Sequence, residues 1–85
     1  MKLRYYSASW CKVCKAMQPM VEAVCKSEGV PFEFVDVETL GFTEDTKSIT
    51  SLPTIEIRNE KGHVKDCRAG KISQHDLLKW IRGYK

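Results

Sequence analysis

Strand-like and helix-like segments alternate along this chain of 85 residues, and that order limits the folds open to it. Four short segments are rich in aromatic and β-branched residues or alternate between apolar and polar residues, as strands do. These predicted strands cover Lys2–Tyr6, Phe32–Val37, Thr54–Arg58 and Val64–Ala69. Predicted helices cover Cys11–Glu28, Gly41–Lys47 and a last segment from Ser73 to about Gly83. A polar turn, Asn59–His63, joins the last two strands as a hairpin.

The two longer predicted helices each have an apolar face. In the first, apolar residues recur at spacings of i, i+4, i+7, i+8 and i+11, which trace one side of a helix. They are Val13, Met17, Met20, Val21 and Val24. Gly29 is a natural helix end, and Pro31 prevents continuation. Ser73 can cap the last helix, whose apolar residues are Leu77, Leu78, Trp80 and Ile81.

This order of elements, β-α-β-α-β-β-α, predicts an α/β fold. Two strands joined by a helix are parallel with a right-handed crossover in nearly all proteins, so the first two strands should be parallel. The hairpin makes the last two strands antiparallel. A four-stranded mixed sheet with helices on both faces would bury all the apolar stripes. The length predicts a single domain that covers residues 1–85.

Composition and charge exclude several classes of protein. The 14 Lys and Arg residues against 11 Asp and Glu leave a net charge of +3, too small and too evenly spread for nucleic-acid binding. No apolar run approaches the roughly 20 residues of a membrane helix. The opening residues lack the apolar core of a secretory signal. We therefore expect a soluble, monomeric, cytoplasmic protein with neither nucleic-acid nor membrane partners.

Cys11 and Cys14 form a Cys-Lys-Val-Cys segment where the first strand meets the first helix. The N–H groups of a helix N-terminus have no intrahelical partners, and the helix dipole is positive there, so a thiolate is stabilised. Such a setting lowers a cysteine pKa from near 8.5 to roughly 3.5–7.5. Lys12 and Lys15 add positive charge. Cys14 shares the buried stripe, so we expect Cys11 to be exposed and anionic and Cys14 to be recessed and neutral.

Metal binding is the main alternative use of such a pair. A zinc site needs a second pair of ligands at suitable spacing, and neither Cys25 nor Cys67 belongs to another Cys-x-x-Cys. His63 and His75 are not at finger spacing from them, and we interpret both as surface residues. Cys25 and Cys67 are interpreted as packed small apolar residues. No metal and no cofactor is therefore predicted.

Several motifs together resemble the thioredoxin family. "WCKVCK" is similar to the active-site segment of that family, and Pro19 stands where the family's active-site helix is kinked. "SLPT" is similar to the segment that holds the family's cis-proline, here Pro53, and "KGHVKDCRAG" to its last hairpin and following glycine. The resemblance runs from about Lys2 to Ile81. In length the chain is closer to a glutaredoxin than to a full-length thioredoxin.

The resemblance implies a thioredoxin-like fold and a small thiol–disulfide oxidoreductase that reduces protein disulfides. It implies that Cys11 attacks the substrate and that Cys14 resolves the mixed disulfide. The implied substrate-binding residues are Trp10, Lys12, Val13, Leu52 and Pro53. Pro53 would pack against the cysteine pair and the Leu52 backbone would pair with an extended substrate. The implied partners are disulfide-containing proteins and an electron donor such as a thioredoxin reductase.

Two departures from the family pattern bear on function. Lys12 and Val13 replace the usual Gly-Pro between the cysteines, which alters the reduction potential and the partners. Tyr5 stands where the family carries a buried aspartate that helps proton transfer, so deprotonation of Cys14 would rely on water or a lysine. Two alternative functions stay open: a glutaredoxin-like, glutathione-dependent oxidoreductase, and a thiol- or metal-binding module without turnover.

Overall fold

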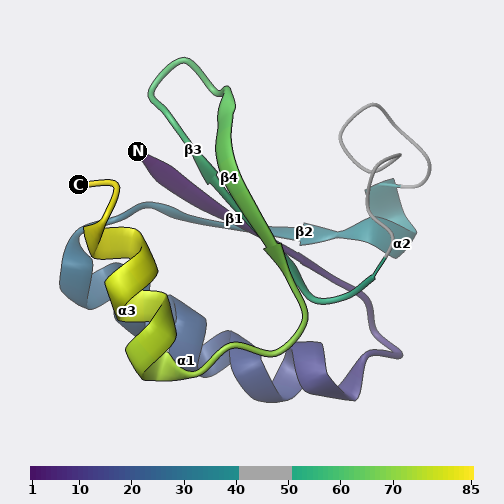
Figure 1. Ribbon diagram of the computed structural model, residues 1–85. Coiled ribbons are helices and arrows are strands. Elements are labelled where there is room, and N and C mark those ends of the chain that lie inside the picture. Colours follow the sequence, from purple (N-terminus) through teal and green to yellow (C-terminus); the bar gives the residue numbers. More distant parts are fainter. Residues whose placement is uncertain (41–50) are drawn as a thin grey trace.

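A four-stranded mixed sheet with long helices on one face forms the centre of the molecule (Figure 1). The computed structural model describes residues 1–40 and 51–85. The strands are β1 (Lys2–Ser7), β2 (Phe32–Asp36), β3 (Thr54–Arg58) and β4 (Val64–Ala69). The helices are α1 (Lys12–Glu28), α2 (Val37–Leu40) and α3 (Gln74–Arg82). The strand order is β2-β1-β3-β4, and β1 pairs antiparallel with β3. The parallel pairing of β1 with β2 and the antiparallel pairing of β3 with β4 are as predicted.

The central strand β1 presents a different chemistry on each side of the sheet. Leu3 and Tyr5 point to the side covered by α1 and α3, and both are fully buried. The alternate residues Arg4 and Tyr6 lie on the opposite side, because successive side chains of a strand point to opposite faces. The main core on the helix side comprises Leu3, Tyr5, Met17, Val21, Val24, Cys25, Val30, Ile55, Ile57, Ile72, Leu77, Trp80 and Ile81.

Helix α1 begins and ends where its sequence signals predict. Cys11 is the N-cap, with its sulfur accepting a hydrogen bond from the Cys14 N–H, and Gly29 ends the helix with a left-handed φ of 69°. The buried stripe consists of Cys14, Met17, Val21, Val24 and Cys25. The prediction that Val13 belongs to this stripe is wrong: its side chain is 44% exposed. At about 100° per residue, Val13 lies beside Val24 at one margin of the stripe and in the first turn of the helix, so the helical period alone does not show that it is exposed.

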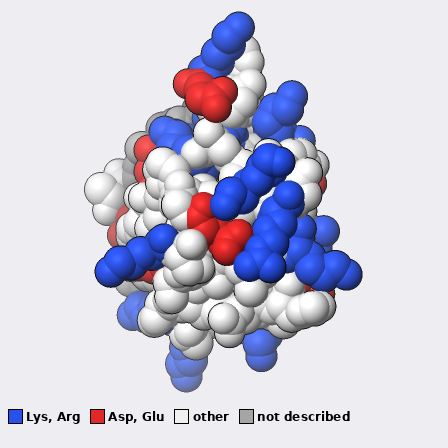
Figure 2. All heavy atoms as spheres, turned by 90° about the vertical axis from the view of Figure 1, so that its left-hand side faces the viewer, with Lys and Arg blue, Asp and Glu red and all other residues white. Residues whose placement is uncertain are grey.

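Helix α3 packs beside α1 on the same face of the sheet. Ser73 caps it by accepting a hydrogen bond from the Asp76 N–H at 3.1 Å, which confirms the predicted start. Arg82 from its last turn donates two hydrogen bonds to Glu28 at the end of α1. The end of the molecule that carries the C-terminus is rich in lysine and arginine (Figure 2), and it lies away from the start of α1 (Figure 1).

The strand β2 ends one residue earlier than predicted, because Asp36 caps a short helix. Its Oδ1 atom accepts hydrogen bonds from the N–H groups of Glu38, at 2.9 Å, and Thr39, at 3.4 Å. Helix α2 therefore begins at Val37. The helix predicted over residues 41–47 lies outside the described residues. No helix in the described parts of the chain is long and apolar enough to cross a membrane.

The two cysteines outside the active-site segment have different surroundings. Cys25 is 1% exposed within the core, as predicted. The prediction that Cys67 is also packed is wrong, because its side chain is exposed. Cys67 lies on β4, an edge strand of the sheet, and on the face opposite α1 and α3, where it pairs with Glu56 of β3. Strand alternation alone does not reveal which strand forms the edge.

The sheet face opposite α1 and α3 carries a buried polar cluster. Glu56 accepts hydrogen bonds from the Tyr6 hydroxyl and from the Arg58 guanidinium, both at 2.9 Å. Arg4 contacts the Tyr6 hydroxyl at 3.3 Å and forms an ion pair with Glu33. Burial raises the pKa of Tyr6, so this phenol remains a neutral donor. The cluster links β1, β2 and β3 across their polar face.

Candidate active site

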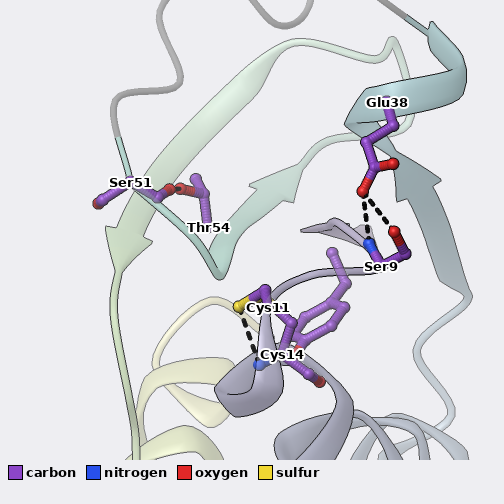
Figure 3. Close-up of a disulfide and its surroundings, with 7 residues drawn as sticks. Ser9, Cys11, Cys14, Glu38, Ser51 and Thr54 are labelled. Carbon is purple, nitrogen blue, oxygen red and sulfur yellow. Dashed lines mark hydrogen bonds between the residues drawn. A yellow bond between two sulfur atoms is a disulfide. The ribbon is translucent and has the colours of Figure 1, made fainter.

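Cys11 and Cys14 are joined by a disulfide at the junction of β1 and α1 (Figure 3). Their Cα atoms lie 5.3 Å apart, within the usual range for a disulfide. Cys14 is completely buried, and Cys11 is 8% exposed. Cys11 is thus the more accessible of the two, although the prediction of a well-exposed Cys11 is wrong. Side chains from two other segments cover most of it.

The backbone around Cys11 is arranged to favour a negative sulfur. The N–H of Cys14 points at the Cys11 sulfur at 3.2 Å, so a thiolate at position 11 would accept this hydrogen bond. The helix dipole adds positive potential at the same place. Lys12 and Lys15 are exposed in the first turn of α1, which holds no carboxylate. After reduction of the disulfide, these groups would lower the pKa of the Cys11 thiol.

An apolar surround covers the disulfide. Ala8, Val37 and Leu52 pack against the two cysteines. Pro53 is buried, and the peptide bond that precedes it is cis, as the resemblance implies. The Thr54 hydroxyl donates a 2.6 Å hydrogen bond to the carbonyl oxygen of Ser51, which closes the turn that carries Leu52 and Pro53 (Figure 3). The structure thus brings Leu52, from a distant segment, to the cysteine pair.

The remaining residues predicted to bind substrate are exposed at the surface. Trp10 immediately precedes Cys11 and is 69% exposed, so it is not a core residue. Lys12 and Val13, between the two cysteines, are exposed as well. A hollow of about 210 Å³ adjoins Val13 and is lined by Val13, Ala16, Met17, Met20, Lys71 and Ile72. An accessible apolar surface therefore lies beside the disulfide.

Tyr5 lies inside the core where the family pattern has a carboxylate. Its hydroxyl donates a 2.6 Å hydrogen bond to the carbonyl oxygen of Cys14. Burial raises the pKa of Tyr5 to about 12. The group is therefore neutral at physiological pH and acts as a hydrogen-bond donor. It connects the central strand directly to the first turn of α1.

The sequence did not point to Ser9, in the loop before Cys11, or to Glu38, which holds that loop. Both the N–H and the hydroxyl of Ser9 donate hydrogen bonds to Glu38 at 2.7 Å (Figure 3). The available signal was weak: Asp36 two residues before Glu38 is a helix-cap pattern, which would have placed a helix start near the end of β2. The partner of Glu38 could not be inferred from that pattern.

Metal-binding groups do not gather around the cysteine pair in the part of the chain that the structure describes. Within residues 1–40 and 51–85, no three His, Cys, Asp or Glu side chains lie close enough to hold an ion together. Cys25 is in the main core, and Cys67 is on the other face of the sheet. What the pair can do on its own is form and break a disulfide.

Comparison with known proteins agrees with this geometry. The sequence matches the thioredoxin family over residues 2–83. A Dictyostelium discoideum protein with the provisional name thioredoxin-4 is 37% identical over 51 residues, which cover 59% of this chain and only 49% of that relative. The match thus spans about half the length of the relative.

Solved structures show the same architecture over nearly the whole chain. Thioredoxin 1 from Thermosipho africanus is 26% identical, with a TM-score of 0.85 over 99% of this chain and 93% of that one. Oxidised thioredoxin from Plasmodium falciparum is 28% identical, with a TM-score of 0.77 over 96% of this chain and 78% of that one. The predicted fold and resemblance are confirmed, and the chain belongs to the thioredoxin family of thiol–disulfide oxidoreductases.

Proposed function

We propose that this protein reduces disulfide bonds in other proteins, with Cys11 as the attacking residue and Cys14 as the resolving residue. The observation that carries the proposal is the asymmetry of the pair. Cys11 caps α1 and is the more exposed of the two, and its sulfur accepts a 3.2 Å hydrogen bond from the Cys14 N–H. Cys14 is fully buried one turn further on.

The reaction proceeds in two exchanges. In the reduced protein, the Cys11 thiolate attacks one sulfur of a substrate disulfide, forms a mixed disulfide and releases one substrate thiolate, which takes up a proton. Cys14 then loses its proton and attacks the Cys11 sulfur. This step forms the Cys11–Cys14 disulfide and releases the second substrate thiolate. Two electrons pass from the protein to the substrate, so no cofactor is needed for the chemistry.

The exposed apolar groups beside the disulfide support binding of an extended segment of a substrate protein. Trp10 and Val13 are the exposed apolar side chains next to the cysteines, and the hollow beside Val13 is large enough for a side chain. Leu52 and Pro53 lie on the turn that faces the disulfide, where the Leu52 backbone would pair with the substrate. Lys12 supplies a positive charge for an acidic group.

Each cycle ends with an oxidised protein, so a two-electron donor must restore the dithiol. A thioredoxin-reductase-like enzyme is the donor proposed here, with glutathione as the alternative. A reducing compartment such as the cytoplasm suits the two other thiols, Cys25 and Cys67, which are unpaired. The protein is proposed to act as a monomer.

Trapping of the mixed disulfide tests the proposal. Cys14→Ser should accumulate a covalent adduct with a protein substrate such as insulin through Cys11, because the resolving thiol is gone. Cys11→Ser should accumulate none. Equal trapping by both variants would contradict the assigned roles, and no trapping by either would contradict covalent exchange.

Two further measurements separate the alternatives. Turnover that requires glutathione and glutathione reductase would identify a glutaredoxin-like enzyme. Zinc or iron at one equivalent per chain, in protein purified without chelators, would identify a metal-binding module.

A further inference from the structure

Ser9 and Glu38 form a polar contact between the active-site loop and α2. The backbone N–H and the hydroxyl of Ser9 both donate to the same carboxylate oxygen of Glu38, Oε1, at 2.7 Å each. Figure 3 shows the two residues facing each other from separate elements. Ser9 lies two residues before Cys11, and Glu38 follows Ser9 by 29 residues. The contact therefore fixes the loop to a different part of the fold.

Helix α2 is itself well anchored beside the cysteines. The Glu38 N–H donates a 2.9 Å hydrogen bond to the Asp36 side chain at the end of β2, which fixes the first turn of α2. The adjoining residue Val37 packs against the cluster formed by Ala8, Cys11 and Cys14. The corner between β2 and α2 thus holds the loop through an apolar contact and a pair of hydrogen bonds.

The loop that Glu38 holds carries the exposed residue next to the attacking sulfur. The Cys11 N–H donates a 3.1 Å hydrogen bond to the Ala8 carbonyl oxygen, so residues 8–11 form a tight turn. Trp10, within that turn, is 69% exposed, so packing against the core contributes little to its orientation. Ser9, its immediate neighbour, is the point at which the turn is tied to α2.

We infer that Glu38 is a positioning residue, which holds the Ser9–Trp10 turn in the orientation that presents Trp10 and Cys11 to a substrate protein. The inference rests on the proposed function. Because one oxygen accepts both hydrogen bonds, an amide oxygen at the same place can do so as well. The role depends on hydrogen bonding, and the negative charge of Glu38 is not required.

The test compares two substrates across a small set of variants. Under the inference, a protein substrate such as insulin would contact the surface around Trp10, whereas a small aromatic disulfide such as dithiobis(nitrobenzoate) would need little more than access to Cys11. Glu38→Ala should reduce insulin about five- to tenfold more slowly, because misplacement of a binding group slows a reaction strongly. Its rate with the small disulfide should stay within about twofold, since the thiol itself is untouched.

The conservative variant and a matched control sharpen the result. Glu38→Gln should keep the wild-type rate with insulin to within about twofold, because both hydrogen bonds survive. Ser9→Ala removes only the hydrogen bond from the hydroxyl, so its rate with insulin should lie between those of wild type and Glu38→Ala. If Glu38→Ala does not fold, Ser9→Ala takes its place in the test. Glu60→Ala removes an exposed carboxylate in the β3–β4 turn and should behave as wild type.

Three outcomes would overturn the inference: an unchanged insulin rate in Glu38→Ala, an equal loss in Glu38→Gln and Glu38→Ala, or an equal loss with both substrates. Failure of the proposed function is distinguishable from these, because the wild-type protein itself would then not reduce insulin.

Discussion

The Tyr5 hydroxyl donates a 2.6 Å hydrogen bond to the Cys14 carbonyl oxygen and so links the central strand to the buried cysteine of the disulfide. In the family pattern a carboxylate occupies the position of Tyr5. A buried carboxylate can exchange a proton with the resolving thiol, whereas a phenol with a pKa of about 12 remains neutral through the physiological range. Here the residue at position 5 has a structural role, and under the proposed mechanism Cys14 would lose its proton to water or to a lysine.

Tyr5→Phe should therefore weaken the fold and leave the chemistry largely intact. Removal of the hydroxyl deletes one buried hydrogen bond and should lower the free energy of unfolding by about 1–2 kcal/mol. Urea denaturation measures this change, and the insulin assay measures activity. A loss of more than about tenfold in rate by a folded variant would show instead that the phenol takes part in proton transfer.

Cys11 and Cys67 should respond differently to pH in the reduced protein. The Cys11 sulfur lies at the N-terminus of α1 near Lys12 and Lys15, so its pKa should lie below the free-cysteine value of about 8.5. Partial burial and the nearby carboxylates of Glu56 and Asp66 raise the pKa of Cys67. Alkylation at pH 6–9, followed by mass spectrometry of each site, should show Cys11 reacting at the lower pH. A half-maximal pH for Cys11 at or above that of Cys67 would contradict the proposed mechanism.

Cys25 should make the protein less stable at alkaline pH. Burial, with a smaller contribution from Glu22, raises the pKa of its thiol from 9.0 to about 11. The unfolded chain therefore loses this proton first, so the contribution of Cys25 is complete below pH 9 and declines up to about pH 11. The slope is about 1.4 kcal/mol per pH unit within that window.

Cys25→Ala removes this titration and is the matched comparison. The difference in free energy of unfolding between wild type and Cys25→Ala, measured in urea under reducing conditions, should be constant below pH 8. It should then change in favour of the variant between pH 9 and pH 11. A difference that stays constant over the whole range would contradict the assigned burial of the thiol.

Among the carboxylates on the polar face of the sheet, Glu56 should contribute most to the stability of the fold. Glu56→Ala removes the group that accepts from Tyr6 and Arg58 inside the protein, and should lower the free energy of unfolding by about 3 kcal/mol. Glu56→Gln keeps an oxygen that can accept the hydrogen bond from Tyr6, so it should lower the free energy of unfolding by less than Glu56→Ala does. Glu60→Ala, in the exposed turn, should change stability by at most about 0.5 kcal/mol. Equal effects of Glu56→Ala and Glu60→Ala in urea denaturation would show that the cluster does not stabilise the fold.

The parts of the fold that the sequence predicts well are those with a strong periodic pattern and clear end signals. Helix α3 is an example, since Ser73 caps it and Leu77, Trp80 and Ile81 are buried. The prediction for Val13 is wrong because this residue fits the same helical period but lies at the margin of the buried stripe. Only the packing of α1 against the rest of the fold shows that Cys14 is buried in the first turn and that Val13 is exposed.

Features that depend on contacts between distant segments were not predictable. The exposure of Cys67 follows from the position of β4 at the sheet edge, which is a property of the strand order. The small exposure of Cys11 follows from Val37 and Leu52, which come from two other parts of the chain. The contact between Ser9 and Glu38 is of the same kind, since neither residue has a pattern that indicates its partner.

The β4 edge has a consequence for the behaviour of this protein in concentrated solution. A free strand edge can recruit a strand from another molecule and so begin aggregation. Here the edge carries the exposed cations Lys65 and Arg68, and its pairing with β3 is irregular at Ile57 and Arg58. If two copies paired along β4, these cations would repel one another and the irregular strand would pair poorly. The β4 edge therefore resists pairing with a second molecule.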